Sequence, residues 1–176
     1  MADKAFIKLG EKEVELPIYV GTEGEESIDI NKLRDLTGFV TLDSGYKNTG
    51  ATKSGITFLD GELGILRYRG YPIEQLAEKS NFMEVAYLLL YGELPTNDQF
   101  VDFTDRITHH TLVHEDVKQF FDGFPSNAHP MGQLCSLMCT LSSFYPDSLN
   151  PNMSKEATDL TIIRILAKMA TVVSWI

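Results

Sequence analysis

The stretch of this chain richest in side chains for acid–base or metal chemistry is Thr108–His114 (THHTLVH), which holds three of the four histidines. On a helix His110 and His114 would share one face, and a histidine pair at this spacing can bind zinc. The stretch lacks the glutamate of the zinc metalloprotease motif, however, and the sequence offers no evident third ligand. A general base would also need a substrate within reach, which the sequence does not indicate. We therefore predict no metal site, and we assign no catalytic role to His109, His110, His114 or His129.

Two cysteines four residues apart, Cys135 and Cys139, are the other candidates for metal or redox chemistry. Their spacing places both on one face of a predicted helix, in step with Met131, Leu134 and Met138. Two thiols alone do not make a structural zinc site, and neighbours on one helical face rarely meet the geometry of a disulfide. The pattern predicts two reduced side chains packed in a hydrophobic core.

The composition of the chain excludes several classes of function. Its 176 residues carry a net charge of −10 and no basic stripe, which argues against a nucleic-acid binder. The chain has no apolar run of 18 or more residues and no signal-peptide core, so we expect no membrane segment and a cytoplasmic location. If an anionic substrate binds, a local cationic pocket has to supply the charge.

The elements that would position these side chains fall into two parts. Residues 1–70 predict a small β-rich segment, in which two strands within residues 4–20 are joined at Gly10. A strand passing into a turn or one helical turn follows, then an irregular connection over residues 37–55, and then a β-ribbon at residues 55–59 and 65–69.

Residues 71–176 predict helices, so the whole chain is expected to be mainly α with a small β-rich segment at its amino end. Six helices are expected. The first begins at Pro72, the second runs from a Ser80 cap to Leu90, and the third opens with a capping box at Thr96. The fourth covers residues 115–122, the fifth about 130–144, and the sixth starts at Lys155.

The last of these helices is apolar on every side, so we expect it to be buried all round. The sequence ends at Ile176 without the Gly, Asn, Pro or basic residue that usually closes a helix. This pattern predicts the amino-terminal part of a longer polypeptide. The alternative is a terminal helix that docks into a partner subunit.

Two segments of the chain resemble a known family. Residues 56–77 (ITFLDGELGILRYRGYPIEQLA) and 84–96 (EVAYLLLYGELPT) resemble the signature near the amino end of citrate synthases. The similarity extends over residues 9–168 and is closest to the bacterial, NADH-regulated, hexameric type II branch. The resemblance implies a citrate synthase-like helical domain that assembles into a homo-oligomer, either a dimer or a hexamer.

The same resemblance implies a transferase that condenses acetyl-CoA with oxaloacetate and water to give citrate and CoA, with no required cofactor. The aspartate and histidine motifs that catalyse this reaction in the family are not found in these residues. We therefore expect the catalytic groups beyond residue 176 and an inactive chain when it stands alone. Two alternatives stay open: a 2-methylcitrate synthase, which differs in its acyl pocket, and a non-catalytic helical scaffold or regulatory subunit that pairs through the last helix.

The resemblance also implies an allosteric pocket for the inhibitor NADH. Arg164 and Lys168 lie four residues apart, so on a helix they could hold a phosphate together, beside Tyr145. The alternative is that they are only the polar stripe of an apolar helix. His109 stands where NADH-sensitive members carry arginine, so we expect weak or absent inhibition. The positions that match the family's pocket are His110, Thr111, Tyr145, Arg164 and Lys168.

Overall fold

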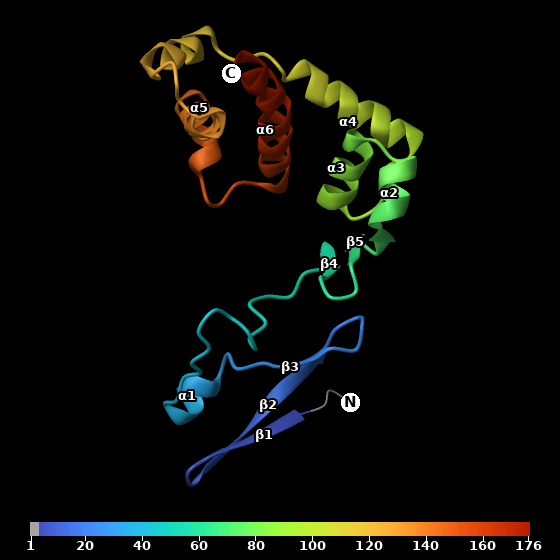
Figure 1. Cartoon of the computed structure of the whole chain (residues 1–176), viewed down its shortest axis with the longest axis vertical. Coiled ribbons are helices and arrows are strands. Elements are labelled where there is room, and N and C mark those ends of the chain that lie inside the picture. The colour runs from blue at the N-terminus through green and yellow to red at the C-terminus, as the bar shows by residue number, and fades with distance from the viewer. Residues whose placement is uncertain (1–3) are drawn as a thin grey trace. The chain divides into compact units, whose positions relative to one another are not determined.

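The computed structural model describes residues 4–176, which divide into two compact units at the Gly55–Ile56 junction (Figure 1). Sheets are small and lie toward the amino end, and the second unit is built mostly of helices, so the expected mainly α fold is confirmed. The sequence placed a boundary near residue 70, whereas the β-ribbon that precedes that residue groups with the helices that follow it. None of the helices in the described part of the chain has the length and apolarity needed to cross a membrane.

The first unit is a three-stranded antiparallel sheet followed by a short helix. Gly10 makes the turn between the first two strands with a φ of 65°, a left-handed conformation that glycine adopts without strain. Leu16, in the middle strand, is 1% exposed, and the short helix packs against that strand. The elements are β1 (Lys4–Leu9), β2 (Lys12–Val20), β3 (Glu26–Ile28) and α1 (Leu33–Thr37).

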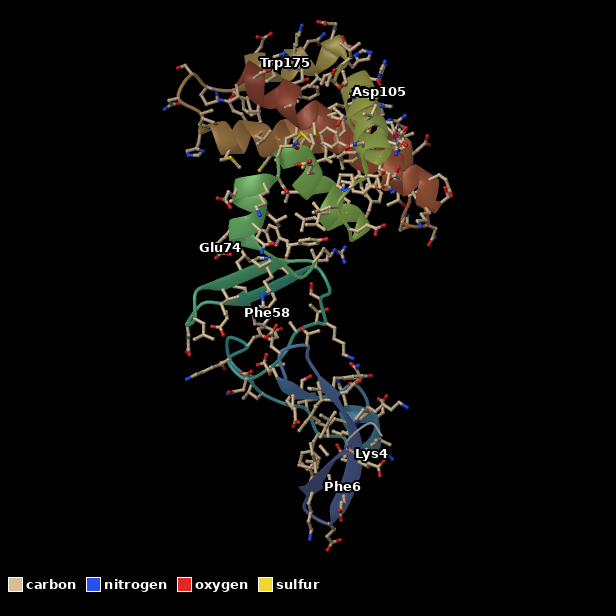
Figure 2. The ribbon with its side chains drawn as sticks, turned by 90° about the vertical axis from the view of Figure 1, so that its right-hand side faces the viewer. Lys4, Phe6, Phe58, Glu74, Asp105 and Trp175 are labelled. Carbon is tan, nitrogen blue, oxygen red and sulfur yellow. The ribbon has the colours of Figure 1, made fainter. Side chains whose placement is uncertain are left out.

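The second unit begins with an antiparallel ribbon that leads directly into a helix, and Figure 2 labels Phe58 on the ribbon and Glu74 on that helix. The helix begins at Ile73, one residue after the predicted start, because Pro72 is still paired with Arg67 in the ribbon. The guanidinium of Arg69 donates a hydrogen bond of 2.8 Å to the carbonyl of Leu89 and so ties the ribbon to the next helix. The elements are β4 (Thr57–Asp60), β5 (Ile65–Tyr68), β6 (Tyr71–Pro72) and α2 (Ile73–Lys79).

The next two helices, α3 (Phe82–Tyr91) and α4 (Asn97–His109), both start with a capping box. Thr96 caps α4 as predicted. The predicted cap of α3, Ser80, is wrong: the cap is Asn81, whose side chain accepts from the N–H of Glu84. Ser80 is already committed to the end of α2, where its N–H donates to the carbonyl of Leu76.

The longest helix, α6 (Lys155–Trp175), takes part in both hydrophobic clusters of the second unit, and Figure 1 shows α5 beside it. The cluster shared with α4 consists of Phe103, Ile107, Ile163 and Ala167. The other cluster consists of Val117, Leu137, Leu141 and Val172. Its remaining members come from the 3₁₀ helix η1 (Glu115–Gly123) and from α5 (Pro130–Phe144), and the turn η2 (Pro146–Leu149) links α5 to α6. Because α6 contacts both groups, it fixes α4 and α5 relative to each other within this unit.

Two expectations about packing are wrong. The last helix is not buried all round, since Ile165, Met169 and Val173 are 45%, 38% and 52% exposed. In α5 the side that enters the core is that of Leu137 and Leu141, and both cysteines are exposed instead of buried. The physical reason is the same in both cases: these helices carry apolar residues on more than one face, and only the position of the neighbouring helices decides which face is covered.

Candidate functional site

The predicted site residues meet where α6 passes the end of α4. Lys168 is 3% exposed, and its ammonium donates hydrogen bonds of 2.8 Å to the carbonyl of His110 and 2.5 Å to the carbonyl of Leu112. One turn along α6, the hydroxyl of Thr171 donates to the carbonyl of Thr111 at 2.8 Å. Three consecutive carbonyls, which follow the last residue of α4 and have no helical partners, are thus bound by α6. We call this arrangement of Lys168 and Thr171 on residues 110–112 the carbonyl clasp.

Tyr145, Arg164 and Lys168 line one small pocket beside the carbonyl clasp. The guanidinium carbon of Arg164 lies 5.0 Å, and the ammonium of Lys168 5.1 Å, from the centre of the Tyr145 ring, which suits cation–π attraction. The pocket has a volume of about 100 Å³. Because Lys168 is buried and directed at main-chain oxygens, Arg164 is the more accessible of the two cations.

The five predicted residues take part in two different ways. Tyr145, Arg164 and Lys168 contribute side chains to the pocket, whereas His110 and Thr111 contribute their carbonyls to the carbonyl clasp. Sequence reasoning identified the two cations on one helical face but missed the role of the carbonyls, because nothing in a sequence marks which main-chain oxygens lack partners.

The four histidines are all engaged with the main chain through Nδ1. His109 and His110 bond to the carbonyls of Asp105 and Arg106, four residues back along α4. His114 and His129 instead accept from the N–H groups two residues ahead and so cap η1 and α5. The prediction that His110 and His114 share a helical face is wrong, because α4 ends at His109.

Within residues 4–176, no group of three or more histidine, cysteine, aspartate or glutamate side chains is placed to hold a metal ion.

A second polar cluster, which sequence reasoning missed, joins α3, α4 and α6. The carboxylate of Asp159 accepts a hydrogen bond from the hydroxyl of Tyr91 and forms an ion pair with Arg106. The three residues line a groove of about 400 Å³ together with neighbours that include Tyr87 and Phe103, whose rings meet edge to face. These residues lie 53 or more positions away from Asp159 in sequence, so no local pattern could have revealed the cluster.

The same cluster shifts the ionisation of its members. Partial burial and the bond to the Asp159 carboxylate raise the pKa of Tyr91 to about 12. Burial opposes ionisation of Asp159, but the hydrogen bonds from Tyr91 and Arg106 outweigh it and lower the pKa of this carboxyl group. At neutral pH the cluster therefore holds a neutral phenol, a carboxylate and a guanidinium.

Comparison with known proteins decides the family. Residues 45–176 match the profile of the family described as "Citrate synthase, C-terminal domain". The chain belongs to the citrate synthase family. Citrate synthase 1 of Mycobacterium tuberculosis is 52% identical over 173 residues, which are 98% of this chain and 40% of the relative. The citrate synthase of Corynebacterium glutamicum is 46% identical over 167 residues, which are 95% of this chain and 38% of the relative.

The chain thus spans about 40% of the length of the relatives that it matches. The family resemblance inferred from residues 56–77 and 84–96 is confirmed, and membership of the hexameric, NADH-regulated branch stays a prediction.

Solved structures agree with this fold. The crystal structure of citrate synthase from Thermotoga maritima matches with a TM-score of 0.61 and 29% identity, covering 75% of this chain and 33% of that one. Citrate synthase from Thermoplasma acidophilum, solved as a ternary complex with carboxymethyl coenzyme A and oxaloacetate, matches with a TM-score of 0.66 and 20% identity. That match covers 75% of this chain and 34% of that one. The helical arrangement described above is therefore that of the citrate synthase fold.

Proposed function

We propose that this chain forms the amino-terminal part of a citrate synthase, an enzyme that condenses acetyl-CoA with oxaloacetate and water to give citrate and CoA. The observation that carries the proposal is the 52% identity to citrate synthase 1 of M. tuberculosis over 98% of the chain. Identity at this level over nearly the whole chain favours a shared reaction over a shared fold alone.

The catalytic groups, in this proposal, lie outside residues 1–176, and the chain by itself turns over no substrate. The behaviour of the four histidines supports this, because Nδ1 of every imidazole is bonded to a nearby main-chain atom. These bonds give Nδ1 of each histidine a local structural role at a helix end.

A chimera tests both statements. The 173 matching residues of the M. tuberculosis enzyme are replaced by this chain, and release of the CoA thiol from acetyl-CoA is measured in the presence of oxaloacetate. We expect the chimera to release CoA and the isolated chain to release none above the uncatalysed background. A folded but inactive chimera contradicts the assignment to citrate synthase, and CoA release by the isolated chain contradicts the proposed location of the catalytic groups. A chimera that prefers propionyl-CoA favours 2-methylcitrate synthase instead.

We also propose that the chain assembles with copies of itself, and the outward stripe of α6 supports this. Ile165, Met169, Val173 and Ile176 recur at intervals of four, four and three residues and are all exposed in the single chain. An apolar stripe with this spacing is suited to pack against another helix. We expect light scattering to give a mass above the 19.7 kDa of one chain, and Val173→Glu to lower it. Ser174→Glu, at an exposed neighbouring position, is the control, and a monomeric wild-type chain contradicts the proposal.

For the allosteric ligand, we propose that NADH inhibits this protein weakly or not at all. Two features support this: His109 replaces the arginine of NADH-sensitive members, and Lys168 is already directed at two carbonyls. A charged hydrogen bond contributes about 2 kcal/mol, so His109→Arg should tighten NADH binding more than about tenfold. Titration of NADH into wild type and His109→Arg, followed by nucleotide fluorescence, tests this. Equal affinities show that the histidine is no obstacle.

A further inference from the structure

Two of the four histidines, His114 and His129, occupy the N-cap positions of η1 and α5. Nδ1 of His114 accepts a hydrogen bond of 3.2 Å from the N–H of Asp116. In the same way, Nδ1 of His129 accepts one of 3.2 Å from the N–H of Met131. A main-chain N–H can only donate, so Nδ1 of each ring is unprotonated and the proton of the neutral ring lies on Nε2. We call these two residues the histidine caps.

The other two histidines use Nδ1 in the opposite sense. His109 and His110, at the end of α4, place Nδ1 at 2.9 Å and 2.7 Å from the carbonyls of Asp105 and Arg106. A carbonyl can only accept, so Nδ1 of both rings carries a proton, and a second proton on Nε2 leaves these bonds in place. A positive charge at the carboxyl end of a helix is also favourable.

Protonation acts differently on the histidine caps, because an imidazole with protons on both nitrogens has no acceptor left. The N–H groups of Asp116 and Met131 then lose their partners, and a positive ring lies at the amino end of a helix, where the helix dipole disfavours it. Histidine is the side chain that ordinarily changes its charge between about pH 8 and about pH 5. Acid in this range therefore breaks the histidine caps and spares the end of α4.

Both histidine caps serve the same hydrophobic cluster, which η1 and α5 share with α6. Val117 of η1 and Leu137 and Leu141 of α5 are three of its four buried members. The ring of His114 also stacks on that of Phe144, the last residue of α5, with ring centres 4.9 Å apart. Loss of the two caps therefore weakens two elements that depend on each other for their packing.

The charged groups around His114 act in both directions. The carboxylate of Asp116 lies 3.5 Å from Nδ1 and favours a protonated ring, whereas Glu115 is already paired with Lys118. Lys168 of α6 binds the carbonyl two residues before His114 and opposes protonation. Because the carboxylate and the imidazole are both more than half exposed, their ion pair offsets only part of the lost cap.

The surroundings of His129 contain less that could compensate. Residues 130–144 include no aspartate, glutamate, lysine or arginine, and their only titratable side chains are the thiols of Cys135 and Cys139. Within residues 4–176, no ion pair is formed by His129. Its protonation therefore costs the cap of α5 without a new attraction in return.

We propose that the histidine caps are a pH-sensitive device: when both rings gain a proton, η1 and α5 loosen and the packing of the cluster that they share with α6 weakens. The protons come from solvent, only hydrogen bonds are broken, and raising the pH restores them. The device depends on bonds within the second unit alone, so it does not rest on the condensation reaction proposed above.

Thermal unfolding of the 176-residue chain, followed by the fluorescence of Trp175, tests the proposal, because this ring packs against the same cluster. The reference is the double variant His114→Asn, His129→Asn, since asparagine is a good N-cap whose side-chain oxygen accepts throughout this pH range. From about pH 8 to about pH 5.5, we expect the Tm of the wild type to fall by roughly 3–6 °C relative to the double variant. Of the single variants, His129→Asn should remove the larger part of this fall.

His109→Asn, which changes an exposed histidine at the end of α4, is the matched control and should keep the full pH dependence of the wild type. Nitrogen NMR of the histidine rings identifies the tautomers directly: at about pH 8 we expect the proton of His129 on Nε2 and that of His110 on Nδ1. A proton on Nδ1 of His129 overturns the proposal. So does a wild-type Tm that follows the double variant over the whole pH range, or a pH dependence that disappears in His109→Asn.

Discussion

Replacing Lys168 with methionine removes the charged half of the carbonyl clasp while nearly preserving the length of the side chain. In the wild-type structure the ammonium of Lys168 satisfies the carbonyls of His110 and Leu112, and its burial leaves almost no access for water to replace it. Methionine has no donor, so both carbonyls would lose their partner.

The size of the effect follows from two opposing contributions. A buried carbonyl left without a partner costs about 1–3 kcal/mol, and two are at stake. Methionine, however, avoids the cost of burying an ammonium ion, which offsets part of this loss. We expect the free energy of unfolding to fall by about 2–4 kcal/mol, a large share of the ~5–15 kcal/mol typical of a folded domain.

Urea unfolding followed by the fluorescence of Trp175 measures this change. Trp175 is the only tryptophan, and it lies at the end of α6 with its ring centre 6.0 Å from that of Phe121. Thr171→Val removes only one neutral hydrogen bond of the carbonyl clasp and should cost about 1 kcal/mol. Lys155→Met, an exposed lysine at the start of the same helix, is the matched control and should change stability by less than about 0.5 kcal/mol.

The two clasp variants also test whether the three bonds act as a unit. Lys168 and Thr171 bind adjacent carbonyls, so the double variant should lose less stability than the two single variants together. If Lys168→Met is as stable as wild type, or more stable, the ammonium contributes no net stability and our account of the carbonyl clasp is refuted.

Three further predictions concern other parts of the second unit. The pKa of the Tyr91 hydroxyl is raised to about 12 in the folded protein, so the unfolded chain loses this proton at a lower pH than the folded one. The contribution of Tyr91 to the free energy of unfolding is therefore fully present below about pH 10 and is lost as the pH rises toward 12. Because Tyr91 is 41% exposed, the loss should be only about 1 kcal/mol, and Tyr91→Phe should remove this part of the pH dependence in unfolding measured from pH 9 to 12. Gly92 ends α3 with a φ of 98°, so Gly92→Ala should cost about 1 kcal/mol by thermal unfolding although its Cβ meets no atom within 4 Å. Gly132→Ala, inside α5 and equally uncrowded, should instead stabilise the protein by about 0.5–1 kcal/mol. If both variants destabilise the protein, crowding around the added Cβ and not backbone strain is the cause at Gly92.

Local elements were predictable where their signals are local. The turn at Gly10, the capping box at Thr96 and the start of the last helix at Lys155 all appear in the structure as expected, because each depends on a few neighbouring residues. Asn81 shows the limit of this reasoning. Two adjacent residues could cap α3, and the end of α2 decided which one was available.

The candidate site was predictable only in part. Spacing alone put Arg164 and Lys168 on one side of a helix, and the structure places both cations around the ring of Tyr145. That Lys168 points into main-chain carbonyls, and that Asp159 joins Tyr91 to Arg106, depends on segments more than 50 residues apart.

The sequence by itself determined the family, the helical character of residues 71–176 and most helix starts, because these depend on residue type and short-range spacing. Only the tertiary structure decided which faces of α5 and α6 are covered, why the two cysteines are exposed and where the ammonium of Lys168 is used. The reason is that burial is a property of pairs of elements. An apolar helix face carries no information about its neighbour until the chain has folded around it.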